Sequence, residues 1–207
     1  MRQQKINEIL TFLHRSRKLE SQKRYKSSLL PSAQNTVAEH SWRLSLMAFL
    51  IAKECNLEIN MERVLSLAML HDLAEAKTGD LDAVDQIREG QKLIDKKAIL
   101  EEEALNKMTS DLSFGDWIYS LWREYEDQET VEAKFVKALD KIEGFLHISE
   151  VGVDNYILPE FSADYCEKAV AAFDNITSHF PNLKDFLDDI KSQLKLEFEK
   201  VGVKWVE

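Results

Sequence analysis

The sequence predicts an all-α fold, and three observations support this prediction. Apolar residues recur at intervals of three and four along most of the 207 residues, as they do on one face of a helix. Strict alternation of apolar and polar residues, the pattern of a half-buried strand, is nearly absent. Glycine and proline, which interrupt helices, occur only six and three times.

Helical spacing predicts eight segments. Thr36 is a suitable N-cap for the second segment, because Glu39 follows three residues later in the capping-box position. Pro159 and Pro181 mark the breaks before the last two segments. The predicted segments cover residues 3–15, 36–56, 60–76, 91–109, 114–125, 129–150, 162–178 and 182–199.

The connection between the first two segments, residues 16–35, is polar and basic and contains Pro31. It is too long for a plain turn, and connections of this length are usually functional or disordered. Residues 1–26 hold eight Lys or Arg against two Glu, a local charge of +6. This charge indicates either a solvated helix face or a rim that attracts anions.

Length and composition suit one domain over residues 1–207, with no internal repeat or linker. The net charge of −10 disfavours nucleic-acid polymers as partners, because phosphate contacts need Lys and Arg. The longest apolar run, 46–52, is too short to span a membrane, and the N-terminus lacks a signal-peptide pattern. Cys55 and Cys166 lie far apart, in no CxxC pattern. We expect a soluble, cytoplasmic protein without a membrane partner.

Residues 69–80, with the sequence MLHDLAEAKTGD, place two potential metal ligands side by side at the end of an apolar helical run. His71 and Asp72 are these ligands, while His40 and Asp140 lie on the inward stripes of two other predicted helices. Taken singly, a buried His is usually a hydrogen-bonded core residue, and a buried Asp a cap or half of an ion pair. Taken together, three helices direct imidazole or carboxylate groups inward, which suits Mn, Co, Fe or Zn.

Mg²⁺ would fit these ligands only with the help of substrate oxygens, because it prefers an all-oxygen shell. Four protein ligands on an octahedral metal leave positions for water, as a catalytic site requires. Charged groups at the end of such an apolar helix are costly to bury unless they are paired or bound to a metal. The sequence therefore predicts one divalent metal site.

The ordered set His40, His71-Asp72 and Asp140 resembles the HD-domain superfamily of metal-dependent phosphohydrolases. The longer string from His71 to Asp80 is similar to the HDxxExxxGD string of bacterial 5′-deoxynucleotidases and their eukaryotic relatives. The resemblance implies a compact multi-helix HD-domain fold, with a metal-site core over about 3–150 that helices at about 160–200 complete. It implies a single metal, because no His lies between His71 and His147, where dinuclear HD enzymes use additional histidines.

The same resemblance implies that Glu75 and Asp80 are active-site acids. The residues alone also favour an active-site role for Glu75. It lies four positions after His71, on the same helix face, and a negative charge at a helix C-terminus is not stabilised by the helix dipole. A solvent-facing charge is the alternative for Glu75. Asp80 would otherwise be a turn residue or an N-cap after Gly79.

Arg24-Tyr25 in the basic connection resembles an Arg followed by an aromatic residue in the deoxynucleotidases. There the Arg holds the phosphate and a Trp crowds the sugar 2′ position, so Arg24 and Tyr25 are the candidate substrate-binding residues. Tyr in place of Trp, a spacing one residue longer, and Leu81-Asp82 in place of a proline-bearing stretch leave the choice of substrate open. Arg15 and Arg17 are alternative phosphate ligands.

The expected function is that of a hydrolase that releases phosphate from (deoxy)nucleoside 5′-monophosphates. Two alternatives remain: an HD hydrolase of a triphosphate, guanosine polyphosphate or cyclic dinucleotide, and a regulatory module that binds metal or nucleotide without catalysis. Among the remaining histidines, His147 is either a pocket residue or a core residue, and His14 and His179 are surface or packing residues. The resemblance implies a homodimer, and the residues beyond about 155 carry no motif.

Overall fold

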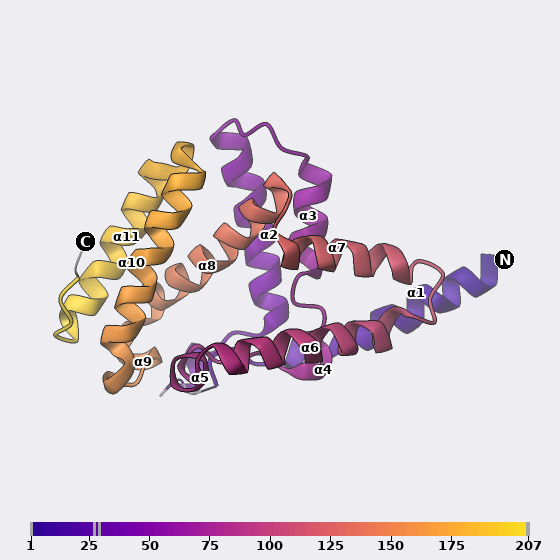
Figure 1. The fold of residues 1–207 in the computed structure, drawn as a ribbon, viewed down its shortest axis with the longest axis horizontal. Coiled ribbons are helices and arrows are strands. Elements are labelled where there is room, and N and C mark those ends of the chain that lie inside the picture. Colours follow the sequence, from indigo (N-terminus) through magenta and orange to yellow (C-terminus); the bar gives the residue numbers. More distant parts are fainter. Residues whose placement is uncertain (1, 27, 29, 206–207) are drawn as a thin grey trace.

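The computed structural model describes residues 2–26, 28 and 30–205. These residues form helices joined by short connections, so the prediction of an all-α fold is confirmed (Figure 1). The described part of the chain contains one isolated antiparallel bridge, between Lys23 and Thr36, and no longer strand. No helix in this part is both long enough and apolar enough to cross a bilayer.

Eleven α-helices and four short 3-10 helices make up the described fold. The 3-10 helices are η1 (Arg17–Ser21), η2 (Pro31–Ala33), η3 (Pro159–Phe161) and η4 (Pro181–Leu183). The α-helices are α1 (Arg2–Ser16), α2 (Val37–Glu54), α3 (Met61–Leu70), α4 (Glu75–Thr78), α5 (Ala83–Glu89), α6 (Gln91–Thr109), α7 (Gly115–Asp127), α8 (Val131–Val151), α9 (Val153–Tyr156), α10 (Ser162–His179) and α11 (Lys184–Lys200).

The predicted helix over 60–76 is wrong in one respect. Helix α3 ends at Leu70, residues 71–74 form turns, and α4 begins at Glu75. The turn closes through short-range hydrogen bonds, with the Asp72 carbonyl accepting from the Glu75 amide at 3.0 Å. It lets Leu73 and Ala74 enter the core while Asp72 and Glu75 line the pocket on the other side. Helix α5 was not predicted.

Helix α8 lies at the centre of the molecule, with α2, α3 and α7 on one side and α10 and α11 on the other (Figure 1). Ten of its 21 residues are buried, and most of these have apolar side chains that face the two groups of neighbours. The larger hydrophobic cluster surrounds it and draws on α2, α3, α7, α10 and α11. A polar side chain that faces inward from α8 is therefore removed from solvent.

A second, smaller hydrophobic cluster is formed where side chains of α6 and α7 pack against α4 and the turn before it. Its buried members are Leu73, Ala74, Ala76, Ala104, Leu105, Met108, Ile118 and Trp122. Helix α1 is joined to this part by the ion pair of Arg15 with Asp111 at 2.6 Å and by the contact of Phe12 with Phe114. Because the turn 71–74 joins the two clusters, its polar side chains lie in the cleft between them.

The start of α2 is fixed by a capping box, as predicted. The Thr36 hydroxyl accepts from the Glu39 amide at 3.1 Å, and the Glu39 carboxylate accepts from the Thr36 amide at 2.6 Å. The basic connection is tied to the same point, since the Arg24 amide donates to the Asn35 carbonyl at 2.9 Å. Arg24 and His40 are thereby held near each other by one local structure.

Candidate metal centre and active site

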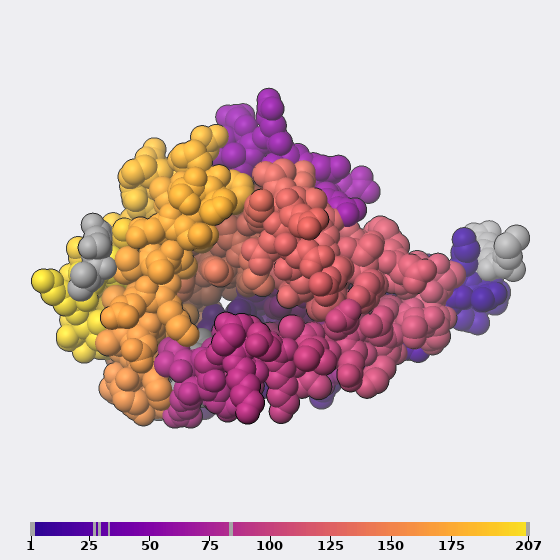
Figure 2. Space-filling view, in the orientation of Figure 1, coloured from indigo at the N-terminus to yellow at the C-terminus, as the bar shows by residue number. Residues whose placement is uncertain are grey.

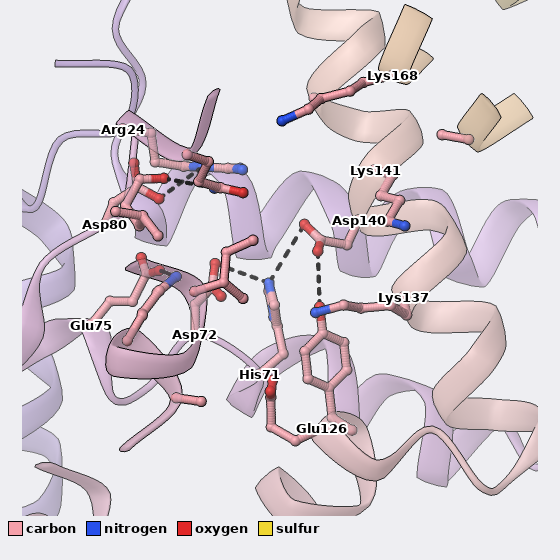
Figure 3. Close-up of a pocket in the computed structure, with 18 of the residues that line it drawn as sticks. Arg24, His71, Asp72, Glu75, Asp80, Glu126, Lys137, Asp140, Lys141 and Lys168 are labelled. Carbon is pink, nitrogen blue, oxygen red and sulfur yellow. Dashed lines mark hydrogen bonds and ion pairs between the residues drawn. The ribbon is translucent and has the colours of Figure 1, made fainter. Parts of the chain in front are cut away.

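The predicted metal ligands meet at the edge of the cleft, where one ligand atom each of His40, His71 and Asp140 lies within 4.8 Å of the others. Figure 3 shows His71, Asp72 and Asp140 close to one another. The Nε2 atoms of His40 and His71 lie 3.3 Å apart. A carboxylate oxygen of Asp140 lies 3.1 Å from His40 Nε2, and one of Asp72 lies 3.0 Å from His71 Nε2. His40 comes from α2, Asp140 from α8, and the adjacent pair from the turn after α3.

The other nitrogen of each imidazole is already engaged. His40 Nδ1 lies 2.5 Å from a carboxylate oxygen of Glu143, and His71 Nδ1 lies 2.9 Å from the Ala68 carbonyl oxygen. Both partners are acceptors, so each Nδ1 carries a proton and each Nε2 can present a lone pair. Two imidazole lone pairs and two carboxylates then face one another, an arrangement that needs a cation between them. The four residues fit a divalent metal.

The electrostatics of these groups agree with this fit. Burial alone would lower the pKa of His71, but the carboxylates of Asp72 and Asp140 outweigh burial and raise this pKa to about 9. Burial would likewise raise the pKa of Asp72 and Asp140, and the two histidines hold both values well below the usual range. The centre therefore favours positive charge, which protons supply when no metal is bound.

Tyr125 of α7 supports the far side of this centre. Its hydroxyl donates to the second oxygen of Asp140 at 2.8 Å, and its ring packs against the His71 ring. The side chain is buried. Tyr125 thus restrains both a carboxylate and an imidazole of the set.

Glu75 lies beside the four candidate ligands and is almost fully buried, so the solvent-facing alternative is wrong. One carboxylate oxygen accepts from the Lys97 ammonium at 2.9 Å, and the other has no hydrogen-bond partner among the described residues. Burial, aided by the charge of Asp72, raises the pKa of Glu75 to about 8 although Lys97 acts against this. Glu75 can therefore hold a proton near neutral pH.

Asp80 reaches the same cleft because Gly79 ends α4 with a φ of 79°, a left-handed conformation that glycine adopts without strain. Its carboxylate lies 3.9 Å from Arg24 Nε. Burial raises the pKa of Asp80, while Arg24 and Lys97 oppose the rise. The two predicted acids are thus brought together, each beside one basic residue.

Arg24 is the arginine that the structure places at this site. It lines the cleft and is nearly buried, and its Nε has no hydrogen-bond partner among the described residues. The alternatives lie elsewhere: Arg15 is paired with Asp111, and Arg17 is exposed beside Glu20. A buried guanidinium donor without a partner is suited to an incoming anion.

Tyr25 also lines the cleft, although its ring is mostly buried behind Arg24. It has a φ of 57°, rare for a residue with a side chain, and its ring stacks on His147 and packs against Tyr156. A Cβ atom at Gly144 would come within 2.9 Å of the Tyr25 hydroxyl, so this position requires glycine. His147 is accordingly a packing residue behind Tyr25.

The cleft has a volume of about 710 Å³ and is open to solvent. Figure 2 shows its mouth as a hollow bounded by α10 and α6. One wall holds Arg24, His71, Asp72, Glu75 and Asp80, and the opposite wall, which includes Asp140, is built by α8 and α10. The region beyond residue 155, which carries no motif, therefore lines the site.

Most of the chain matches a known protein family. The sequence model of that family, described as an HD domain, matches residues 16–179. The chain belongs to the HD domain family.

Several curated proteins are similar to this HD domain chain. The human 5′-deoxynucleotidase HDDC2 is 38% identical over 117 residues, covering 56% of this chain and 53% of the human protein. The Dictyostelium discoideum protein of the same name is 34% identical, with 56% and 62% covered. The chain thus spans about half the length of the curated relatives it matches.

Several solved structures show the same fold. A protein from Magnetospirillum magnetotacticum, described as a predicted metal-dependent phosphohydrolase, superposes with a TM-score of 0.75 at 23% identity, covering 97% of this chain and 99% of its own. An HD-domain phosphohydrolase from Listeria innocua gives a TM-score of 0.66 at 20% identity, with 93% and 98% covered. At these identities the likeness concerns the fold alone.

Three residues of this HD domain site were missed by sequence analysis: Lys97, Tyr125 and Glu143. Glu143 follows Asp140 by three positions and so lies on the same face of α8, a signal that the sequence did offer. Lys97 and Tyr125 come from α6 and α7, whose approach to the cleft depends on tertiary packing.

Proposed function

We propose that this HD domain protein is a divalent-metal-dependent phosphomonoesterase that acts on nucleoside 5′-monophosphates, with deoxynucleotides preferred. One observation carries the proposal: the candidate metal ligands, two acids and an arginine with an unpartnered donor meet in one cleft. The names of the curated relatives support the same substrate class.

His40, His71, Asp72 and Asp140 would hold the metal, which supplies Lewis acidity to the phosphoryl group and lowers the pKa of a water. Arg24 would bind the phosphate through its planar fork of donors and stabilise the charge that grows on it. Its contacts with Asp80 and Glu143, at 3.9 and 3.4 Å, hold the guanidinium at the edge of the metal site.

Hydrolysis of a phosphomonoester requires that the attacking water lose a proton and the leaving sugar oxygen gain one. Glu75 is the group suited to donate, because its pKa of about 8 keeps it protonated near neutral pH. Asp80 is suited to accept, because it faces the same cleft from beside Arg24. Lys97 would hold Glu75 in position from α6.

The test is phosphate release from a panel of 5′-nucleotides by chelated protein reconstituted with Mn, Co, Zn or Mg. We expect inorganic phosphate from deoxynucleoside monophosphates and less from ribonucleotides. Pyrophosphate or triphosphate as the product would identify a different HD hydrolase. A protein that binds nucleotide and metal but releases no phosphate would identify a regulatory module.

We also propose that the protein forms a homodimer in the cytoplasm. An apolar stripe on the outer face of α2, formed by Trp42, Leu46, Phe49 and Leu50, supports an interface with a second copy, and Trp42 is 68% exposed. The free thiols of Cys55 and Cys166 suit a reducing compartment.

Light scattering after gel filtration tests the dimer. Wild type should have twice the mass of the chain, and Trp42→Glu combined with Leu46→Glu should halve it. Trp117→Glu, which alters an exposed tryptophan on α7, is the matched control and should leave the mass unchanged. A monomeric wild type would contradict the proposal.

A further inference from the structure

The wall of the cleft opposite Glu75 and Asp80 carries three lysines. Lys137 and Lys141 lie one turn apart on α8, and Lys168 comes from α10. Figure 3 shows the Lys168 ammonium directed into the cleft, on the side of Asp140 that faces away from His71. Among the described side chains, none of the three forms an ion pair within 4.0 Å.

The other two cations of the cleft each have carboxylates within 4.0 Å. Arg24 is paired with Asp80 and Glu143, and Lys97 with Glu75 and Glu101. The three lysines differ because none of them has a carboxylate within 4.0 Å among the described residues, although Asp140 and Glu126 also line the cleft. The Lys137 ammonium lies 4.3 Å from the centre of the Tyr125 ring.

Like charges at positions i and i+4 of a helix repel each other, so Lys137 and Lys141 on one face are unfavourable without an anion. Lys168 adds a third positive charge to the lining of the cleft from a second helix. A bound anionic group would relieve it and would release counterions from the lysines. The wall that carries the three lysines therefore suits an anionic group of a ligand.

We propose that Lys141 and Lys168, on the wall opposite Glu75 and Asp80, form a second anion subsite for a phosphate group carried by the substrate. This inference rests on the proposed function, since it assumes that the scissile phosphate binds at Arg24. The preferred substrate is then a nucleotide with a second phosphate away from the scissile one. The cleft volume of about 710 Å³ lies in the range of pockets that enclose such ligands.

The test compares two probes that differ by one phosphate, deoxyadenosine 5′-monophosphate and deoxyadenosine 3′,5′-bisphosphate. Their affinities are measured by calorimetry with Mn²⁺ present, in a Glu75→Gln background that prevents turnover. Lys141→Gln with Lys168→Gln removes the distal lysines. Lys134→Gln, on α8 but outside this cleft, is the matched control.

We expect the bisphosphate to bind about tenfold more tightly than the monophosphate, and the double variant to abolish this difference without weakening monophosphate binding. The control should retain the difference. The subsite would be overturned if both probes bound with equal affinity to the Glu75→Gln protein that retains Lys141 and Lys168. It would also be overturned if the double variant lost the same affinity for both probes. Because binding is measured without turnover, the result is independent of whether phosphate release is observed.

Discussion

Glu143 is fully buried, yet it contacts a candidate metal ligand and two arginines. Its carboxylate accepts from His40 Nδ1 at 2.5 Å and lies 3.4 Å from Arg24 and 3.8 Å from Arg43. Burial acts to raise the pKa of Glu143, but His40 and the arginines lower it, so the carboxylate stays charged. This charge fixes the proton of His40 on Nδ1 and orients Arg24.

Glu143→Gln should therefore weaken metal binding about 10- to 100-fold, because a glutamine neither holds the imidazole as firmly nor increases its basicity. Calorimetric titration of chelated protein with Mn²⁺ measures this change. Glu150→Gln is the control on the same helix, since its exposed carboxylate pairs with Arg43 only. Equal Mn²⁺ affinity in wild type and Glu143→Gln would show that Glu143 has no positioning role.

Glu75 makes the stability of the metal-free protein depend on pH. Its pKa is about 8 in the folded protein and near 4.5 in the unfolded chain. Between these values the folded state holds a proton that the unfolded chain has lost, so the free energy of unfolding falls as pH rises.

Glu75→Gln removes this dependence, so its stability relative to wild type should increase by about 1 kcal/mol per pH unit from pH 5 to 8. Urea unfolding at several pH values measures the difference. Glu103→Gln on the exposed face of α6 should show no such trend. A gain that stays constant across this range would mean that Glu75 is ionised throughout.

Helices were the most predictable level of organisation, because their apolar spacing and caps are local. Seven of the eight predicted segments match single helices within a few residues, including α2 with its capping box. The break after Leu70 was not predictable, since Ala74, Glu75 and Ala76 all favour helix and the turn is imposed by packing on both sides. Helix α5 and the approach of α6 and α10 to the cleft likewise depend on tertiary contacts.

Thr36→Ala tests the local structure at the start of α2. It removes one hydrogen bond of the capping box and should lower the free energy of unfolding by about 1 kcal/mol. The Thr36 hydroxyl accepts from Glu39, next to His40, so Mn²⁺ affinity should fall as well. Ser192→Ala, which alters a hydroxyl within α11, is the control. Unchanged stability would show that the cap is not important for this helix.

For the whole molecule, the site is a junction between two hydrophobic clusters. His40 and Asp140 extend from the larger cluster, and the turn that carries His71 and Asp72 leads to α4 in the smaller one. A metal at this junction would join the two parts, so metal binding should stabilise the fold. A free metal concentration 100 times the dissociation constant corresponds to about 2.7 kcal/mol.

Thermal unfolding should therefore shift to higher temperature when Mn²⁺ is added to chelated protein, and the shift should grow with the Mn²⁺ concentration. In Asp72→Ala the shift should disappear. A shift of equal size in that variant would place the stabilising ion elsewhere.

The order of the four candidate ligands was visible in the sequence, whereas the support from Tyr125 and Lys97 required the fold.

We propose that four side chains from α2, α8 and the turn after α3 hold one divalent ion. The most direct measurement is the stoichiometry of Mn²⁺ binding to chelated wild type and to Asp140→Ala, by calorimetry. We expect one ion per chain for wild type and none at comparable affinity for the variant. One tightly bound ion in both proteins, or no bound ion in wild type, would contradict it.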